Sequence, residues 1–175
     1  MKIKATFFVV MVVVLAAFCV TLAFGIVTTF KTGPFTGSID LGVPCNDVNM
    51  SKPVSSELLS GDKYTNYDVN MCNVRLTFTR FDKPLLDVTS VMGNVGVETS
   101  LIISGCDKDT ISLYPREINK MSGTVGKGYK SESGSTLYMA RYYISSYAFG
   151  DIQIWDNETM MISALKTIHV TEAAT

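Results

Sequence analysis

The hydrophobic pattern of the chain begins with one long apolar run. Residues 5–30 contain no charged side chain, and lysines stand on both sides of them at Lys2, Lys4 and Lys31. As an α-helix this run would be about 39 Å long, whereas the hydrocarbon core of a bilayer is about 30 Å thick. The apolar core of a secretory signal is usually shorter, at about 7–15 residues. The pattern therefore predicts a transmembrane anchor over residues 1–30.

A cleaved signal peptide is the alternative interpretation of the same run. Ala23 and Gly25 place small residues where signal peptidase needs them, so cleavage after Gly25 would release a chain that begins at Ile26. Both interpretations put the rest of the chain on the same side of the membrane. Because two lysines precede the run and one follows it closely, we expect the N-terminus in the cytoplasm and the C-terminal domain outside it.

Beyond the run, apolar and polar residues alternate over short segments. The Gly and Pro residues within 31–37 predict a short stalk, and the folded domain is expected over residues 38–175. Residues 73–81 form the clearest predicted strand, because Val74, Leu76 and Phe78 alternate with polar neighbours. The other predicted strands lie at residues 38–43, 85–92, 95–104, 110–114, 135–149 and 151–155.

Turns and loops are predicted where Gly, Asn and Asp gather. Gly93-Asn94 suits a tight turn between the strands at 85–92 and 95–104, and further turns are expected at Gly150-Asp151 and Asp156-Asn157. Residues 46–70 and 122–135 are interpreted as loops.

The last segment, residues 159–170, has conflicting signals. Its methionines and leucine recur at helical spacing, but Ile162, Thr167, Ile168 and Val170 are β-branched, and we predict a strand. Many short strands without a long amphipathic helix indicate a mainly β fold. We expect an antiparallel β-sandwich or barrel-like domain preceded by one N-terminal transmembrane helix.

Three cysteines lie in the predicted domain, at Cys45, Cys72 and Cys106. In an oxidising compartment one disulfide is expected among them, in any of three pairings, with one thiol left over. Two glycosylation sequons begin at Asn49 and Asn157. A net charge of −1 gives no basic surface for phosphates, so we expect no nucleic-acid partner.

Residue types that carry chemistry are sparse. His169 is the only histidine and lies near the C-terminus, where a general base is seldom held rigidly, and no GxSxG motif accompanies it. Asp107-Lys108-Asp109 lacks the remaining ligands of a calcium loop. The glycine-rich residues 123–128 lack the Ser or Thr that follows the lysine of a phosphate-binding loop. We therefore expect no catalytic site, no metal and no cofactor.

A tyrosine-rich segment at residues 138–150 is the best candidate for recognition. On a strand, Arg141, Tyr143 and Tyr147 would share one face, while Tyr138 and Tyr142 would share the other with Ile144. Tyrosine supplies rigid, amphipathic contact area, so Tyr138, Arg141, Tyr143 and Tyr147 are candidate contact residues. The alternative is that these tyrosines only border a core.

These observations favour a structural or interaction protein over an enzyme. We expect a single-pass, membrane-anchored accessory subunit of a membrane complex, or a component of a viral envelope or cell surface. Its partners would be membrane lipid and other membrane or envelope proteins, with a homo-oligomer as a further option. Two alternatives stay open: a secreted β-barrel that binds a small apolar ligand after cleavage at Gly25, and an extracytoplasmic hydrolase that uses paired carboxylates.

Overall fold

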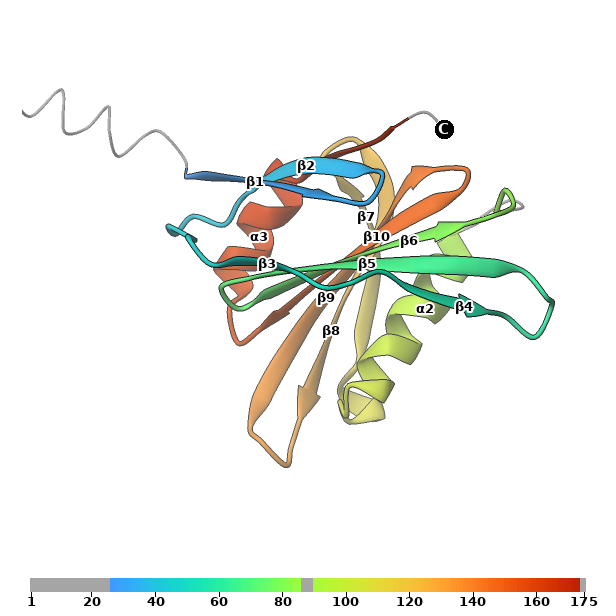
Figure 1. Cartoon of the computed structure of the whole chain (residues 1–175). Coiled ribbons are helices and arrows are strands. Elements are labelled where there is room, and N and C mark those ends of the chain that lie inside the picture. The colour runs from blue at the N-terminus through green and yellow to red at the C-terminus, as the bar shows by residue number, and fades with distance from the viewer. Residues whose placement is uncertain (1–25, 86–89, 174–175) are drawn as a thin grey trace, which may run out of the picture.

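The computed structural model describes residues 26–85 and 90–173, with the side chains of residues 90–92 left out of the description. This part of the chain is mainly β, and all of its strand pairs are antiparallel (Figure 1). The elements in order are β1 (Val27–Thr32), β2 (Phe35–Asp40), β3 (Val48–Met50), β4 (Val54–Glu57), β5 (Lys63–Met71), β6 (Val74–Phe81), α2 (Ser90–Ile103), the short 3-10 helix η1 (Lys108–Thr110), β7 (Ser112–Ile118), β8 (Met121–Lys130), β9 (Ser135–Ser145), β10 (Ala148–Trp155), α3 (Glu158–Thr167) and β11 (His169–Glu172).

The strands form one large and one small sheet. The large sheet has the order β3-β5-β6-β10-β9-β8-β7, and β4 also pairs with β5. The small sheet has the order β1-β2-β11. Alternation along the strands gives the large sheet a core face, which carries Leu76, Val125 and Ile152, and an opposite face, which carries Leu113 and Met139. The mainly β, antiparallel architecture is therefore confirmed, whereas the predicted sandwich or barrel is not.

The helices lie on opposite faces of the large sheet (Figure 1). α3 and the small sheet cover the core face, where Met161, Leu165 and Phe35 are buried. α2 covers the opposite face over β7, β8 and β9, where Val97 and Leu101 pack against Met139. The remainder of that second face, over β5, β6 and β10, carries mostly polar side chains such as Asp68, Thr77 and Gln153, as expected for an antiparallel sheet with one solvated side.

The residues predicted as anchor end and stalk form a β-hairpin instead. β1 and β2 flank a turn at Gly33-Pro34, and Gly33 has a φ of 52°, which favours glycine. Burial alternates along β1, and Phe30 stacks on Phe78 of β6 with ring centroids 5.3 Å apart. The β-branched residues of β1 favour a strand, and this packing holds the strand on the domain.

The predicted single-pass membrane topology is contradicted. Within the described residues, no helix is long and apolar enough to cross a membrane, since α2 has 14 residues and α3 has 10. The predicted helix over residues 1–30 was also wrong at its C-terminal end, because Val27 begins β1. Residues 1–25, including the alternative cleavage site at Gly25, lie outside the described part of the chain.

The two helices replace segments that were predicted as strands. Gly93 and Asn94 lie inside α2, so the turn predicted there was wrong. Apolar residues four apart, Val97 and Leu101, face the sheet, and this helical spacing was hidden by the apolar residues on the other side of α2. Residues 158–167 form α3, and only the β-branched end of that segment continues as the strand β11.

Several predicted loops and turns also lie within strands. The loop predicted at residues 46–70 contains β3, β4 and most of β5, and the loop predicted at 122–135 contains most of β8. The turn predicted at Gly150-Asp151 lies inside β10. Glycines in β8 reflect close packing, because a Cβ at Gly126 would lie 2.7 Å from Val97 of α2.

Candidate interaction surfaces

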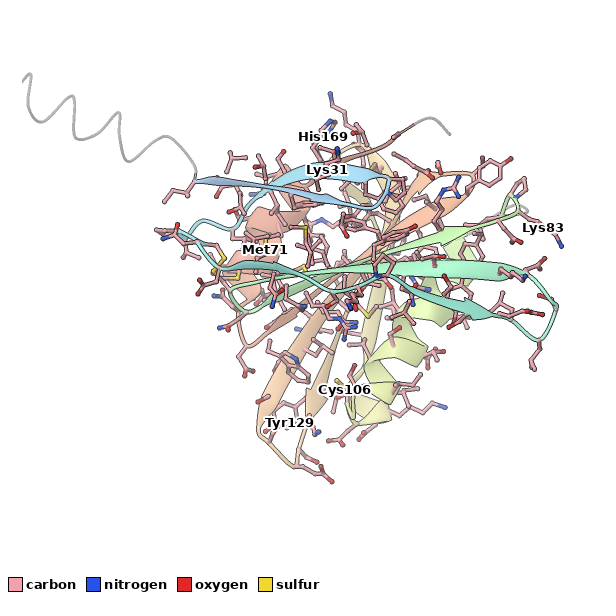
Figure 2. All side chains as sticks on the ribbon, in the orientation of Figure 1. Lys31, Met71, Lys83, Cys106, Tyr129 and His169 are labelled. Atoms are coloured by element: carbon pink, nitrogen blue, oxygen red, sulfur yellow. A yellow bond between two sulfur atoms is a disulfide. The ribbon has the colours of Figure 1, made fainter. Side chains whose placement is uncertain are left out.

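A disulfide joins Cys45 to Cys72. It ties the segment after β2 to the turn between β5 and β6, so the predicted single disulfide is confirmed and its pairing is now defined. Cys106 is the free cysteine of the described residues and lies buried at the end of α2, near the tip of the β8–β9 hairpin marked by Tyr129 (Figure 2). Burial raises the pKa of the Cys106 thiol, which makes it less reactive.

The two sequon asparagines occupy different environments. Asn49 is exposed on β3, where it lies directly opposite Asn70 of β5. Asn157 caps α3, because its Oδ1 accepts a hydrogen bond of 2.9 Å from the backbone N–H of Met160. A glycan would be attached to Nδ2 rather than to the capping oxygen, so capping and modification of Asn157 are compatible. Both sites stay predictions.

Arg141 lies beneath α2, where it forms a two-bonded ion pair with Asp151. Its Nε and Nη2 donate to the two carboxylate oxygens at 2.7 and 2.8 Å, and its guanidinium lies 4.2 Å from the ring centroid of Phe149. Burial raises the pKa of Asp151, and the hydrogen bonds from Arg141 oppose that rise. A Cβ at Gly96 would collide with Nη1 of Arg141, so a glycine fits where the helix crosses the pair.

The predicted tyrosine-rich candidates do not form one surface. Arg141 and Tyr143 share a face, as the alternation predicts, but α2 covers them; the buried phenol oxygen of Tyr143 has no hydrogen-bond partner among the described residues. Tyr138 points to the core face, together with the buried Tyr142. Tyr147 lies in the turn after β9 and is exposed.

Strand pairing gives Tyr138 neighbours that are distant in sequence. Lys127 of β8 lies directly opposite Tyr138, and Ser112 of β7 lies opposite Lys127. Tyr114 is two residues from Ser112 on the same face, and Tyr129 is two residues from Lys127. Neither tyrosine could be found from the sequence pattern, because only the register of β7, β8 and β9 brings these positions together.

The outer side of α2 exposes apolar residues that the strand predicted at residues 95–104 did not indicate. Val95, Ile102 and Ile103 are 54%, 41% and 80% exposed, while Val97 and Leu101 are fully buried on the inner side. From Gly93 to Ile103 the only charged residue is Glu98. α2 therefore carries apolar residues on both sides, although its outer side also holds Glu98 and Thr99.

Two surface hollows, of about 520 and 750 Å³, are lined mainly by polar and charged groups. Arg80 lines both of them and donates to Glu172 at 2.6 Å. A pocket for a small apolar ligand is usually lined by apolar side chains. The described residues also contain no group of three or more His, Cys, Asp or Glu side chains that could hold a metal ion.

The chain was compared with protein-family models, with curated proteins and with solved structures, and none of them matched it.

Proposed function

We propose that this protein is a non-catalytic binding protein that docks a protein partner on the outer side of α2. The observation that carries the proposal is the exposure of Val95, Ile102 and Ile103 on a helix whose inner side is already buried. A surface helix of a globular protein normally has one apolar and one polar side, and a helix that is apolar all round is normally buried.

The geometry of this outer surface suits recognition by a groove. Val95 is seven residues before Ile102 and eight before Ile103, so the three side chains recur on one side of the helix over about 10–12 Å. Such spacing is used by helices that lie in an apolar groove of a partner. Because the sheet already holds α2 in place, docking would not require the helix to order first, which favours affinity.

The energy available from this surface is adequate for a specific contact. Complete burial of a Val or Ile side chain contributes about 1.5–3 kcal/mol. Covering the exposed parts of three such side chains therefore contributes a few kcal/mol, and polar contacts at the edge of the surface would add specificity.

The two other functions have less support. Three carboxylates are each bonded to an arginine, Asp68 to Arg75, Asp151 to Arg141 and Glu172 to Arg80, and this leaves fewer free carboxylates for an acid–base pair. The core face is filled by packed side chains, including stacked phenylalanines, where a barrel-type carrier would hold its ligand. Binding of a protein partner is the function that uses a feature with no other role in the fold.

The proposal is tested by replacing apolar groups of the outer surface with charges. We expect the double substitution Val95→Lys, Ile103→Lys to abolish retention of the partner when the tagged protein is purified from its native source. Both positions are exposed, so the melting temperature should change by only about 2–4 °C. Leu59→Lys is the matched control, because Leu59 is fully exposed in the β4–β5 connection.

Each outcome of this comparison is informative. A protein retained by the wild type and by Leu59→Lys, but lost from the double variant, supports the proposal. If the wild type instead sediments as a dimer that the double variant dissociates, the partner is a second copy and the surface is the same. An identical set of retained proteins and an identical mass for all three chains would contradict the proposal.

A further inference from the structure

A second surface lies on the opposite side of the large sheet from α2, next to α3. We name it the basic strip and define it by six residues: Tyr114, Arg116, Lys120, Lys127, Tyr138 and Lys166. We propose that the basic strip binds an extended, acidic segment of a protein, with acidic side chains at its two ends and an apolar side chain between them. This inference is independent of the function proposed for α2.

Three cations from three different elements form the first end of the strip. Arg116 of β7, Lys120 of the β7–β8 turn and Lys166 of α3 line one hollow of about 240 Å³, with Leu165 in its wall. All three cations are exposed, and none of them forms an ion pair with a carboxylate of the described residues. Their positive charges are therefore available to a ligand.

The turn that carries Lys120 is held rigidly against the end of α3. Asn119 and Lys120 are its two central residues, with φ angles of 43° and 70°, and Nδ2 of Asn119 donates to the carbonyl of Ile168 at 2.7 Å. Two consecutive residues with positive φ are typical of a two-residue hairpin turn, in which Asn is favoured. This anchoring fixes the spacing between Lys120 and the last turn of α3.

The middle and the second end follow from the strand register. Arg116, Tyr114 and Ser112 are alternate residues on the same face of β7. Lys127 of β8 lies directly opposite Ser112. Alternate residues of a strand are about 7 Å apart, so Arg116, Tyr114 and Ser112 follow one another along β7, and Lys127 lies beside Ser112 on the neighbouring strand. Tyr114 is 42% exposed, and Tyr138 lies beside Lys127.

An extended peptide has the same spacing as the strip. Its alternate side chains also lie about 7 Å apart on one side, so an acidic residue at Arg116, an apolar residue at Tyr114 and an acidic residue near Lys127 match in register. Arg and Lys clusters are a recurrent means of recognising acidic motifs. Tyrosine provides apolar contact with little loss of conformational entropy.

Two carboxylates make a uniformly charged polymer the poorer ligand. Glu117 lines the same hollow as Arg116, and Glu158 of α3 lies close enough to Tyr138 to act on its phenol group. A nucleic acid or a sulfated polysaccharide carries negative charge on nearly every unit and would meet both carboxylates. A peptide with acidic residues only at matching positions avoids this repulsion.

The experiment measures fluorescence anisotropy of the full chain with a labelled peptide of repeated Glu-Ser-Leu-Ser at low salt. A peptide in which Gln replaces each Glu tests charge, and labelled oligothymidylate and heparin test the other polyanions. Arg116→Glu and Lys166→Glu should each weaken binding of the Glu peptide about tenfold, and Lys127→Glu should weaken it about as much. Lys52→Glu, at an exposed position beside β4, is the matched control and should change affinity by less than about twofold.

The inference is supported if the Glu peptide binds and the Gln peptide does not. Binding of the Glu peptide should also be lost when the salt concentration is raised, and it should be weakened by the three strip variants. Three results would overturn it: no binding of the Glu peptide, binding that Arg116→Glu and Lys166→Glu leave unchanged, or tighter binding of oligothymidylate or heparin than of the Glu peptide. Val95→Lys, Ile103→Lys should leave peptide affinity unchanged, so the two proposals can fail separately. The thermal transition of each variant shows whether it is folded.

Discussion

Arg141 illustrates how one buried side chain determines the residues around it. Its guanidinium is bonded to Asp151, lies over Phe149 and is crossed by α2 at Gly96. A buried ion pair contributes little net stability, but removal of one partner is costly because the other charge is left uncompensated. The residue therefore packs against α2 within the fold, and its role as a contact residue stays a prediction.

Gly96→Ala tests this packing. A glycine within an exposed helix is usually improved by alanine, by about 1 kcal/mol. Here the added methyl group would collide with Nη1 of Arg141, so we expect the free energy of unfolding to fall by about 1–3 kcal/mol. Urea denaturation monitored by circular dichroism measures it, with Val95→Ala on the outer side of α2 as the control. A more stable Gly96→Ala variant would show that α2 is not packed against Arg141 as described.

At the scale of elements, the sequence predicts strands better than helices in this chain. β6 was found because one of its faces is buried and the other is polar, which gives clear alternation. α2 was not predicted because Val95, Ile102 and Ile103 are apolar although they lie on its outer side. These residues obscure the helical spacing of the buried apolar residues in the sequence. The same three residues carry the proposed function, so the feature that misled the prediction of structure is the candidate site.

The contacts between distant residues of the basic strip could not be predicted for a different reason. Tyr114, Lys127 and Tyr138 belong to three strands, and their proximity depends on a register that no local pattern encodes. The faces of Tyr138 and Arg141, in contrast, were predicted correctly, because alternation within one strand is a local property.

Asn157→Ala tests how α3 begins. The variant loses the hydrogen bond from the N–H of Met160, and we expect a loss of about 1 kcal/mol, or about 2–4 °C in melting temperature. Asn157→Asp retains a capping oxygen and should stay close to the wild type, although it also removes the sequon. Differential scanning calorimetry of unglycosylated protein distinguishes the two variants. Equal melting temperatures for both would refute the capping role.

At the scale of the whole molecule, the Cys45–Cys72 disulfide joins two segments. One follows β2 of the small sheet, and the other is the β5–β6 turn of the large sheet. A disulfide across this sequence separation lowers the conformational entropy of the unfolded chain, and we expect it to stabilise the fold by about 3–4 kcal/mol. The double substitution Cys45→Ala, Cys72→Ala should lower the free energy of unfolding by that amount, as measured by urea denaturation. A wild type whose unfolding midpoint is the same with and without a reducing agent would contradict this expectation.

The large sheet separates two surfaces of different chemistry. The outer side of α2 exposes Val95, Ile102 and Ile103, and the basic strip on the other side of the sheet is cationic with tyrosines between the charges. A molecule with this arrangement is suited to hold two partners at once, one by apolar burial and the other by charge. The apolar surface is the central claim, because it explains a helix that would otherwise be unusual for the surface of a monomer.

Site-specific photocrosslinking tests that claim most directly. A photoreactive amino acid replaces Ile103 in the full chain, and Leu59 in the control, and each protein is irradiated in its native source before purification. We expect a discrete crosslinked product from position 103, either to another protein or to a second copy of the chain, and none from position 59. An absence of product from position 103, or the same products from both positions, would contradict it.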